Sequence, residues 1–238
     1  MTLVVFVPGF MQPAGAWSPV AERLPARHEG LLLDHAEHTY EGRLRELAAA
    51  GPGAVLCGYS LGGRLILRAA LREPERYAGL VTVGASAGIE GPAIRAERAE
   101  ADAKLASWME TQPIEEIVAV WERQPLFADQ SDALVAAQRP GRLSQDPRAL
   151  ALLLRTAGQG ALEPVWQRLH GLSPPLLAIS GSLDERYTDA ARRMARAVPA
   201  GRAAAVEGAG HAPQLQRPDA VAALLVDFLD EHLGERSV

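Results

Sequence analysis

A single serine between two glycines is the first candidate for chemistry in this sequence. The segment Gly58-Tyr59-Ser60-Leu61-Gly62 follows an apolar run and precedes RLILRAALRE, a stretch with helical periodicity. Strand, G-x-S-x-G and helix in this order are typical of a nucleophile elbow, a tight turn that projects the serine hydroxyl above a sheet. We therefore predict that Ser60 is catalytic. The alternative is an ordinary glycine-rich turn between a strand and a helix.

A serine hydroxyl is a poor nucleophile or base at neutral pH, so Ser60 needs a basic partner. Proteins with this elbow supply an acid and then a histidine later in the chain. Asp184 follows the apolar run LLAIS within GSLDERY, and His211 lies in the small-residue loop GAGHAPQLQ. We predict that His211 takes the proton of Ser60, while Asp184 orients the imidazole and stabilises its cation.

Other histidines and acids compete for these two roles on weaker grounds. His28, His170 and His232 lie in predicted helix ends or polar linkers, where we expect them to be solvated. Glu185 and Asp189 are close to Asp184, but we expect them to be N-cap and first-turn residues of the next helix.

The loop after the first apolar run, VPGFMQPAG, is expected to contribute to an oxyanion hole. Gly9 allows the backbone to approach closely, and the backbone N–H of Phe10 would then face the developing negative charge. The second donor would be the N–H of Leu61, because the first N–H groups of a helix have no partner within it.

Arg64 lies in the first turn of the helix predicted after Ser60, where the helix dipole disfavours a cation. The two residues are four apart, so they share a helix face and the guanidinium can lie beside the serine hydroxyl. A cation in that place suits an anionic substrate. The alternative is a solvent-facing arginine paired with a nearby acid.

Short apolar runs alternate with helical stretches along most of the chain. The runs are LVVFV at 3–7, LLL at 31–33, AVLCG at 54–58, GLVTVG at 79–84, LLAIS at 176–180 and AAAVE at 203–207. Continuous apolar runs of this length are typical of strands covered on both faces. We predict an open, doubly wound α/β fold: a mostly parallel sheet of about six strands with helices on both faces.

Between about residues 88 and 170 the sequence has no convincing strand. It contains amphipathic, charge-rich stretches such as IRAERAEADAKLASWMETQ, IEEIVAVWERQ and RALALLLRTAG. We predict a helical cap subdomain at 88–170, inserted after the fourth strand of a core made of residues 1–87 and 171–238. Such an insertion would cover the carboxyl edge of the sheet, where ligands bind in open α/β folds.

Charge and composition exclude several classes of partner. The formal net charge of −5 gives no basic field for nucleic acid or for an anionic membrane. All but one of the 24 cationic residues are arginine, the exception being Lys104. The N-terminal run TLVVFVPGF is too short for a membrane span and lacks the pattern of a secretory signal, which predicts a cytoplasmic protein.

We expect neither a metal nor an organic cofactor, because serine, histidine, aspartate and backbone N–H groups supply proton transfer and charge stabilisation. The segment DHAEH, with Asp34, His35, Glu37 and His38, is a weak metal candidate, since adjacent loop residues rarely converge on one ion. Cys57 is the only cysteine, and its apolar surroundings predict a packed thiol without a redox role.

Five motifs together resemble one family. They are GYSLGGR at 58–64, RAER at 95–98, WERQPLF at 121–127, GSLD at 181–184 and GAGH at 208–211. This combination is similar to the α/β-hydrolase-fold synthases of menaquinone biosynthesis, 2-succinyl-6-hydroxy-2,4-cyclohexadiene-1-carboxylate synthases. The resemblance implies elimination of pyruvate from a succinylated, enolpyruvyl-bearing cyclohexene carboxylate, with Ser60 acting as a base activated by His211 and with Asp184 completing the triad.

The resemblance also implies a binding site for the substrate's carboxylates and ring. Its residues would be Tyr59, Arg64, Arg98, Trp121 and Arg139. Arginines suit this task because they are always charged and can bind a carboxylate through two nitrogens.

Three features depart from the family pattern: Pro8 in place of a histidine, Glu122 in place of a tyrosine, and DHAEH at 34–38, followed by a short segment, in place of D-x-P-G-H. Glu122 would repel an anion if it pointed into the pocket, but it could instead pair with an arginine or face solvent.

Two other functions stay open at this point. A carboxylesterase would use the same residues through a serine ester and would not need Arg64 or Arg98. A non-catalytic ligand receptor would keep the fold without turnover. In every case we expect a small-molecule partner, anionic for the synthase, and a monomer or small homo-oligomer.

Overall fold

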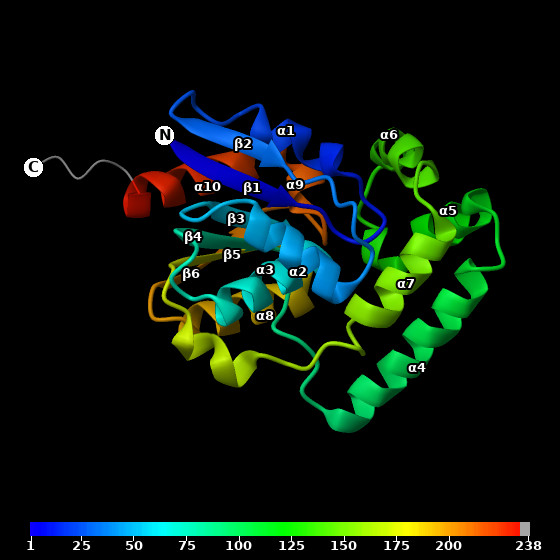
Figure 1. Cartoon of the computed structure of the whole chain (residues 1–238). Helices are drawn as coiled ribbons and strands as arrows, with labels where there is room; N and C mark the ends of the chain where they lie inside the picture. The colour runs from blue at the N-terminus through cyan, green and yellow to red at the C-terminus, as the bar shows by residue number, and fades with distance from the viewer. Residues whose placement is uncertain (234–238) are drawn as a thin grey trace, which may run out of the picture.

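The computed structural model describes residues 1–233 and centres on a six-stranded sheet (Figure 1). All neighbouring strands are parallel, in the order β2-β1-β3-β4-β5-β6. The strands are β1 (Thr2–Val7), β2 (His28–Leu32), β3 (Val55–Tyr59), β4 (Gly79–Val83), β5 (Leu176–Gly181) and β6 (Gly201–Val206). The predicted doubly wound α/β fold is confirmed.

The central strands and the edge strands differ in burial. Every residue of β3, β4 and β5 is buried, which accounts for their continuous apolar sequences. Among residues 1–233, β2 pairs only with β1, from Thr2 opposite His28 to Phe6 opposite Leu32, and all of its residues are exposed or half-buried. The strand therefore begins at His28, before the apolar run at 31–33 that predicted it, because an edge strand can carry polar residues.

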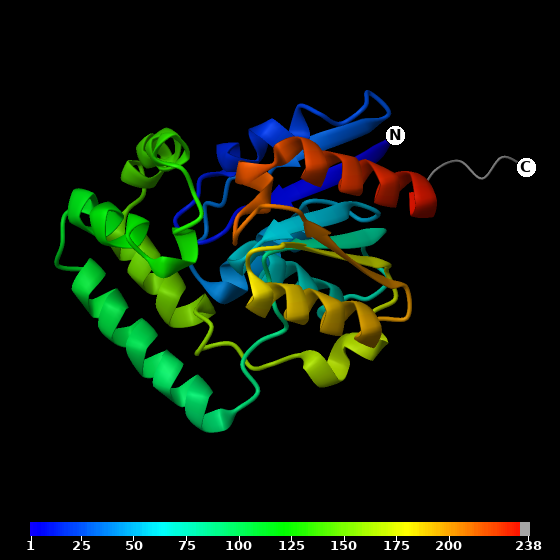
Figure 2. The ribbon, with the colours of Figure 1, turned by 180° about the vertical axis from the view of Figure 1, so that it is seen from behind.

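Helices cover both faces of the sheet (Figures 1 and 2). One face carries α2 (Tyr40–Ala49), α3 (Leu61–Arg72), the 3-10 helix η3 (Trp166–Gly171) and α8 (Glu185–Ala197). The other carries the 3-10 helix η1 (Ala14–Trp17), α1 (Ser18–Ala21), α9 (Pro213–Gln216) and α10 (Pro218–Leu233). Each set encloses its own apolar cluster with one side of the strands, as expected for strands buried on both faces.

The chain between β4 and β5 forms helices beyond the carboxyl ends of the strands (Figure 1). They are α4 (Pro92–Met109), α5 (Ile114–Glu122), the 3-10 helix η2 (Pro125–Phe127), α6 (Asp132–Leu143) and α7 (Pro147–Ala157). Residues of α4, α5 and α7 share a third apolar cluster with Met11 of the loop after β1. η3 also lies in this stretch of sequence, but its Leu169 is buried in the cluster under α3 and α8.

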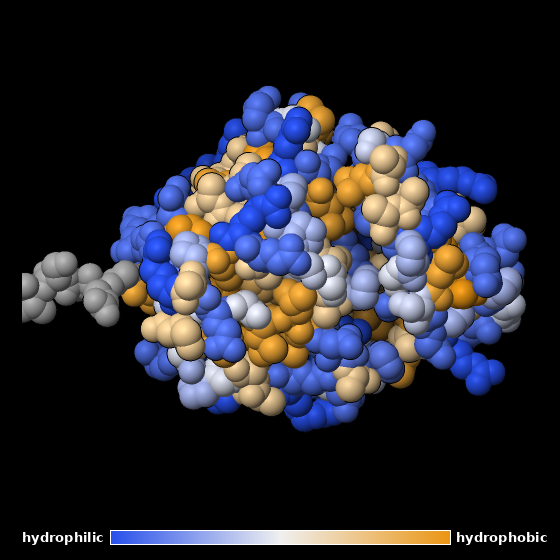
Figure 3. All heavy atoms as spheres, turned by 90° about the horizontal axis from the view of Figure 1, so that it is seen from above, coloured by the Kyte–Doolittle hydropathy of each residue, from blue (hydrophilic) through white to orange (hydrophobic). Residues whose placement is uncertain are grey.

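Figure 3 looks down on the side of the molecule that carries α1 and α6. Polar residues cover most of this face, and apolar residues gather near its middle.

Among residues 1–233, no helix has the length and apolar content needed to cross a membrane.

Candidate active site

The turn at Ser60 has the strained geometry expected of a nucleophile elbow. Ser60 follows β3 and precedes α3 with φ 49° and ψ −104°, a backbone conformation that residues other than glycine rarely adopt. A Cβ on Gly58 would lie 2.5 Å from the carbonyl carbon of Gly62, and a Cβ on Gly62 would lie 2.3 Å from the carbonyl oxygen of Val7. Both glycines are therefore required by the close approach of β3, α3 and β1.

A chain of two hydrogen bonds joins Ser60 to residues from the other half of the sheet. The Nδ1 atom of His211 lies 2.8 Å from Oδ2 of Asp184, and its Nε2 atom lies 3.4 Å from Oγ of Ser60. His211 is only 3% exposed, and the ring of Tyr187 packs 4.4 Å from its imidazole. The structure thus brings together the three side chains that the sequence predicts to act together. The arrangement can pass a proton from Ser60 to His211 while Asp184 stabilises the imidazolium.

Asp184 owes its place to the start of α8. It is itself the N-cap of that helix, a position that the sequence had assigned to its neighbours, and its carboxylate accepts the N–H of Tyr187 at 3.3 Å. Glu185 occupies the first turn, and the exposed Asp189 lies 3.5 Å from Arg192.

The other histidines lie away from Ser60. His170 and His232 are exposed, as expected. The prediction that His28 is solvated is wrong, because His28 is part of β2 and its side chain is buried 3.7 Å from Asp230.

Two backbone N–H groups are available beside the elbow. Leu61 begins α3, and Phe10 lies in the loop after β1; both residues line the cavity in front of Ser60. Within residues 1–233, neither N–H donates a hydrogen bond to another protein group. Paired free donors in this position can stabilise an oxyanion.

The cavity at Ser60 has a volume of about 290 Å³ and opens between the sheet edge and the inserted helices. Its apolar wall is aromatic: the Trp121 ring packs 5.2 Å from Phe10 and 5.8 Å from Phe127. Tyr59 lies beside His211 at 5.4 Å between ring centroids. An aromatic wall facing a few polar groups is the usual composition of a small-molecule site.

Arg64 is a buried cation that points into this cavity. The residue is 6% exposed and lines the cavity with Ser60. Among residues 1–233, no protein group accepts a hydrogen bond from its guanidinium and no acid lies within 4.0 Å of it. Burial lowers the pKa of Arg64 to about 10, so it stays cationic at neutral pH. An unpaired buried charge is costly unless a ligand completes it.

Arg98 also faces the cavity, from the middle of α4. Its Nε atom lies 2.7 Å from Oδ1 of Asp102 one helical turn later, and both residues line the cavity. The other oxygen of Asp102 accepts the backbone N–H of Gly160 at 3.3 Å. Arg98 is thus anchored on one side, with the rest of its guanidinium free on the other.

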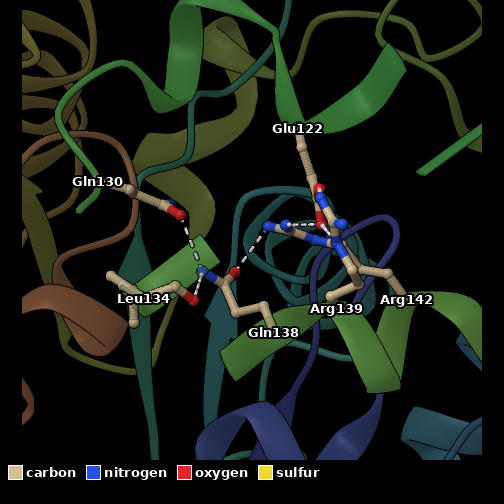
Figure 4. A network of polar contacts seen from close by, with 6 residues as sticks. All are labelled: Glu122, Gln130, Leu134, Gln138, Arg139 and Arg142. Atoms are coloured by element: carbon tan, nitrogen blue, oxygen red, sulfur yellow. Dashed lines mark hydrogen bonds and ion pairs between the residues drawn. The ribbon is translucent and has the colours of Figure 1, made fainter. Parts of the chain in front are cut away.

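Arg139 does not lie where the resemblance implied. Its side chain is 55% exposed, it does not line the cavity, and it pairs with Glu122. Three residues later on α6, Arg142 lines the cavity, and its Nη1 atom lies 3.1 Å from the same carboxylate (Figure 4). Burial raises the pKa of Glu122, but hydrogen bonds from the two arginines outweigh it and hold the pKa below its usual value. Glu122 therefore pairs with arginine, one of the alternatives left open by the sequence.

Comparisons with known proteins agree with this geometry. Residues 4–224 match the model of the alpha/beta hydrolase family. This chain belongs to the α/β hydrolase family. It is 28% identical to the 2-succinyl-6-hydroxy-2,4-cyclohexadiene-1-carboxylate synthase of Enterobacter sp. (strain 638), over 95% of this chain and 91% of that protein.

Two further relatives support the same resemblance. A Bacillus subtilis (strain 168) protein provisionally named for this synthase activity is 32% identical over 177 residues, 73% of this chain and 65% of that protein. The structure of MenH from S. aureus superimposes with a TM-score of 0.90 at 26% identity, covering 97% of this chain and 94% of that one. The predicted resemblance is confirmed, and the chain is an enzyme of the α/β hydrolase superfamily.

Several residues around the cavity of this α/β hydrolase were not found from its sequence. They are Gln12, Phe127, Arg142, Gln159, Arg186 and Tyr187. Phe127 is the last residue of a motif that the resemblance rested on, so it could have been included. Arg142 lies three residues after Arg139, within the predicted cap, and only the placement of α6 decides which of the two faces the site.

The weak metal candidate at residues 34–38 has another explanation in this α/β hydrolase. His35 is buried with its Nδ1 atom 2.5 Å from Oε2 of Glu46, whose other oxygen accepts the N–H groups of Ala36 and Glu37 at 2.8 Å. Within residues 1–233, no group of three or more acids, histidines or cysteines could hold a metal ion. Burial raises the pKa of the Cys57 thiol, which makes it a poor nucleophile.

Proposed function

We propose that this enzyme eliminates pyruvate from a succinylated, enolpyruvyl-bearing cyclohexene carboxylate, the reaction that its resemblance to the synthases implies. One observation carries the proposal. Arg64 is a buried, unpaired guanidinium in the same cavity as Ser60, and a site for neutral esters has no use for it. A ligand carboxylate would restore its missing partner and offset the cost of burying the charge.

In this mechanism Ser60 is a base. His211 takes the hydroxyl proton, Asp184 stabilises the imidazolium, and the serine oxygen removes a proton from the ring of the substrate. The electron pair of that C–H bond moves into the ring, and the bond from the ring to the enolpyruvyl oxygen breaks. The released enolpyruvate takes up the proton held by His211 and becomes pyruvate, which returns His211 to its neutral form. No ester with Ser60 forms.

When the ring proton leaves, negative charge develops on the carbonyl oxygen of the neighbouring succinyl group, and the N–H groups of Phe10 and Leu61 would stabilise this oxyanion. This type of donor acts most strongly in a site from which water is excluded. We assign the ring of the substrate to the aromatic wall at Trp121 and Tyr59. The carboxylates would bind Arg64, Arg98 and Arg142, and not Arg139.

We further propose that residues 88–170 act as a cap subdomain over the core formed by residues 1–87 and 171–238. Trp121 and Phe127 of the aromatic wall and two of the arginines come from this segment, so it would supply most of the substrate contacts. A biosynthetic enzyme of this kind would act in the cytoplasm, and the groups already named perform the reaction without a metal or organic cofactor.

The decisive experiment measures pyruvate release by the purified enzyme from the succinylated precursor, generated in place, and compares it with hydrolysis of p-nitrophenyl acetate. We expect Arg64→Ala to lower kcat/KM for pyruvate release about 10- to 100-fold, because a hydrogen bond to a charged group is worth ~1.5–3 kcal/mol. Hydrolysis of the neutral ester should change much less. Equal losses in both assays would contradict the role of Arg64.

Two other outcomes would select the alternatives. No pyruvate above background together with rapid ester hydrolysis would indicate a carboxylesterase. No turnover of either compound, and no labelling of Ser60 by a fluorophosphonate, would indicate a ligand receptor.

A further inference from the structure

α6 carries a residue of the active site but is weakly packed against the rest of the molecule. Of its 12 residues only Arg142 is buried. None of its residues belongs to the apolar cluster that joins α4, α5 and α7. A second cavity of about 320 Å³, lined by Pro13, Leu134 and Ala137 among others, lies between α6 and the segment around η1, which approach each other closely at Gly141 and Pro13. Apolar packing alone therefore holds α6 and its arginine only loosely.

Polar contacts fix Arg142 instead (Figure 4). Its Nη1 atom donates to Oε1 of Glu122 at 3.1 Å, and its Nη2 atom donates to Oε1 of Gln138 at 2.8 Å. The amide nitrogen of Gln138 in turn donates to Oε1 of Gln130 at 2.8 Å and to the carbonyl of Leu134 at 3.0 Å. The amide of Gln138 is thereby oriented, with its oxygen toward Arg142.

These contacts leave part of the guanidinium free. Arginine has five N–H donors, and the protein uses two of them here. The Nε atom is buried and, among residues 1–233, has no acceptor, although the residue lines the cavity. The ring of Phe127 lies under the guanidinium, 5.8 Å from its central carbon. The group is therefore held by Glu122, Gln138 and Phe127, and its remaining donors have no acceptor among residues 1–233.

The charges of the cluster explain why the Glu122 carboxylate can hold Arg142 without neutralising its positive charge. The side chains of Glu122 and Arg142 are 5% and 3% exposed, whereas Arg139 binds the same carboxylate from the solvent side. Two guanidinium groups share one carboxylate, so the cluster keeps a formal charge of +1. Arg139 offsets Glu122, and the charge of Arg142 stays available to a ligand.

We propose that Glu122 and Gln138 are positioning residues that preset Arg142 as a donor to a ligand carboxylate, with Arg139 as the charge that compensates Glu122. The inference rests on the proposed function in that it assigns this wall of the site to an anionic group of the substrate. A preset arginine binds more tightly because less of its rotamer freedom is lost on binding.

Two substitutions that conserve charge test the geometry. Glu122→Asp withdraws the carboxylate by one methylene, and Gln138→Ala removes the second acceptor. Glu110→Asp is the matched control: it shortens a carboxylate paired with Arg155 between α4 and α7, outside the residues that line the cavity. The probe is succinate, titrated calorimetrically into the full-length protein.

We expect Glu122→Asp and Gln138→Ala each to raise the Kd of succinate about three- to tenfold, with no change for Glu110→Asp. The KM of the succinylated substrate should rise by the same factor, by more than any change in kcat. In an Arg142→Ala background, Glu122→Asp should have no further effect, because Glu122 acts on the ligand only through Arg142.

Other results would overturn the proposal. One such result is an unchanged Kd of succinate in both Glu122→Asp and Gln138→Ala, or an equal rise of this Kd in Glu110→Asp. Another is that the effects of Glu122→Asp and Arg142→Ala on this Kd are additive. A third is that the wild-type enzyme does not bind succinate. Failure of the proposed function is a separate result. If the enzyme releases no pyruvate but binds succinate in a manner that depends on Glu122, the positioning of Arg142 is supported and only the proposed reaction is wrong.

Discussion

The floor and the roof of the active site are built in different ways. The floor, which we define as Ser60, Arg64, Asp184 and His211, comes from loops and a helix start at the carboxyl ends of parallel strands whose residues are mostly buried. The roof comes from inserted helices that present the remaining arginines, together with Trp121 and Phe127, to the cavity.

The contacts that hold the two parts differ accordingly. α3 is buried almost all round, from Leu61 to Ala70. In the roof, an apolar cluster joins α4, α5 and α7, and arginine–carboxylate pairs add further links between helices, as between Arg155 and Glu110 or between Arg142 and Glu122. The floor thus has the rigidity that proton transfer needs, and the roof has contacts that are easily varied. We expect substitutions in the floor to affect the chemical step, and substitutions in the roof to affect binding.

The largest effect should come from the centre of the floor. Ser60→Ala or His211→Ala should lower kcat for the natural reaction at least about 10³-fold, because the residues of such a triad act as a unit. Binding of succinate should persist, since the arginines remain. If a variant of Ser60 keeps more than a tenth of the wild-type kcat, the claim that the floor carries out the chemical step is wrong.

An intermediate effect should separate the two arginines of α6. Arg142→Ala should raise the KM for the succinylated substrate about tenfold, as expected for loss of one hydrogen bond to a charged group. Arg139→Ala should raise it at most about fivefold, because an exposed ion pair is worth ~1 kcal/mol or less. Steady-state kinetics of both variants measure the difference. A larger rise of KM in Arg139→Ala than in Arg142→Ala would indicate that Arg139 is the arginine that binds the substrate.

The smallest effect should be on stability, and it should have an unusual sign. Burial lowers the pKa of Arg64, so the charged side chain destabilises the folded state relative to the unfolded chain. Arg64→Met removes that charge and should stabilise the protein by ~1 kcal/mol, or ~2–4 °C in Tm for a chain of this size. Thermal unfolding of both proteins without ligand measures this, and a clear fall in Tm would show that Arg64 is paired in solution.

Much of the floor could be predicted because its determinants are local. The glycines around Ser60 are required by the close contacts of one turn, and continuous apolar runs indicate strands that are buried on both faces. The order serine, aspartate, histidine and the position of each residue after a strand follow from the chain itself, since parallel strands end at one edge of a sheet. His28 was misjudged for the corresponding reason: nothing local shows that an edge strand passes through it.

The roof depends on how helices far apart in sequence pack together, which no local pattern determines. The sequence alone determined that the chain forms a doubly wound α/β fold with a serine elbow and inserted helices, because periodicity and turn sterics act over a few residues. Only the tertiary structure decided that Arg142 faces the cavity, that Arg139 does not, and that Glu122 lies between them. The reason is that the rotation of α6 is set by partners on other helices, and a rotation of less than one turn exchanges the two arginines.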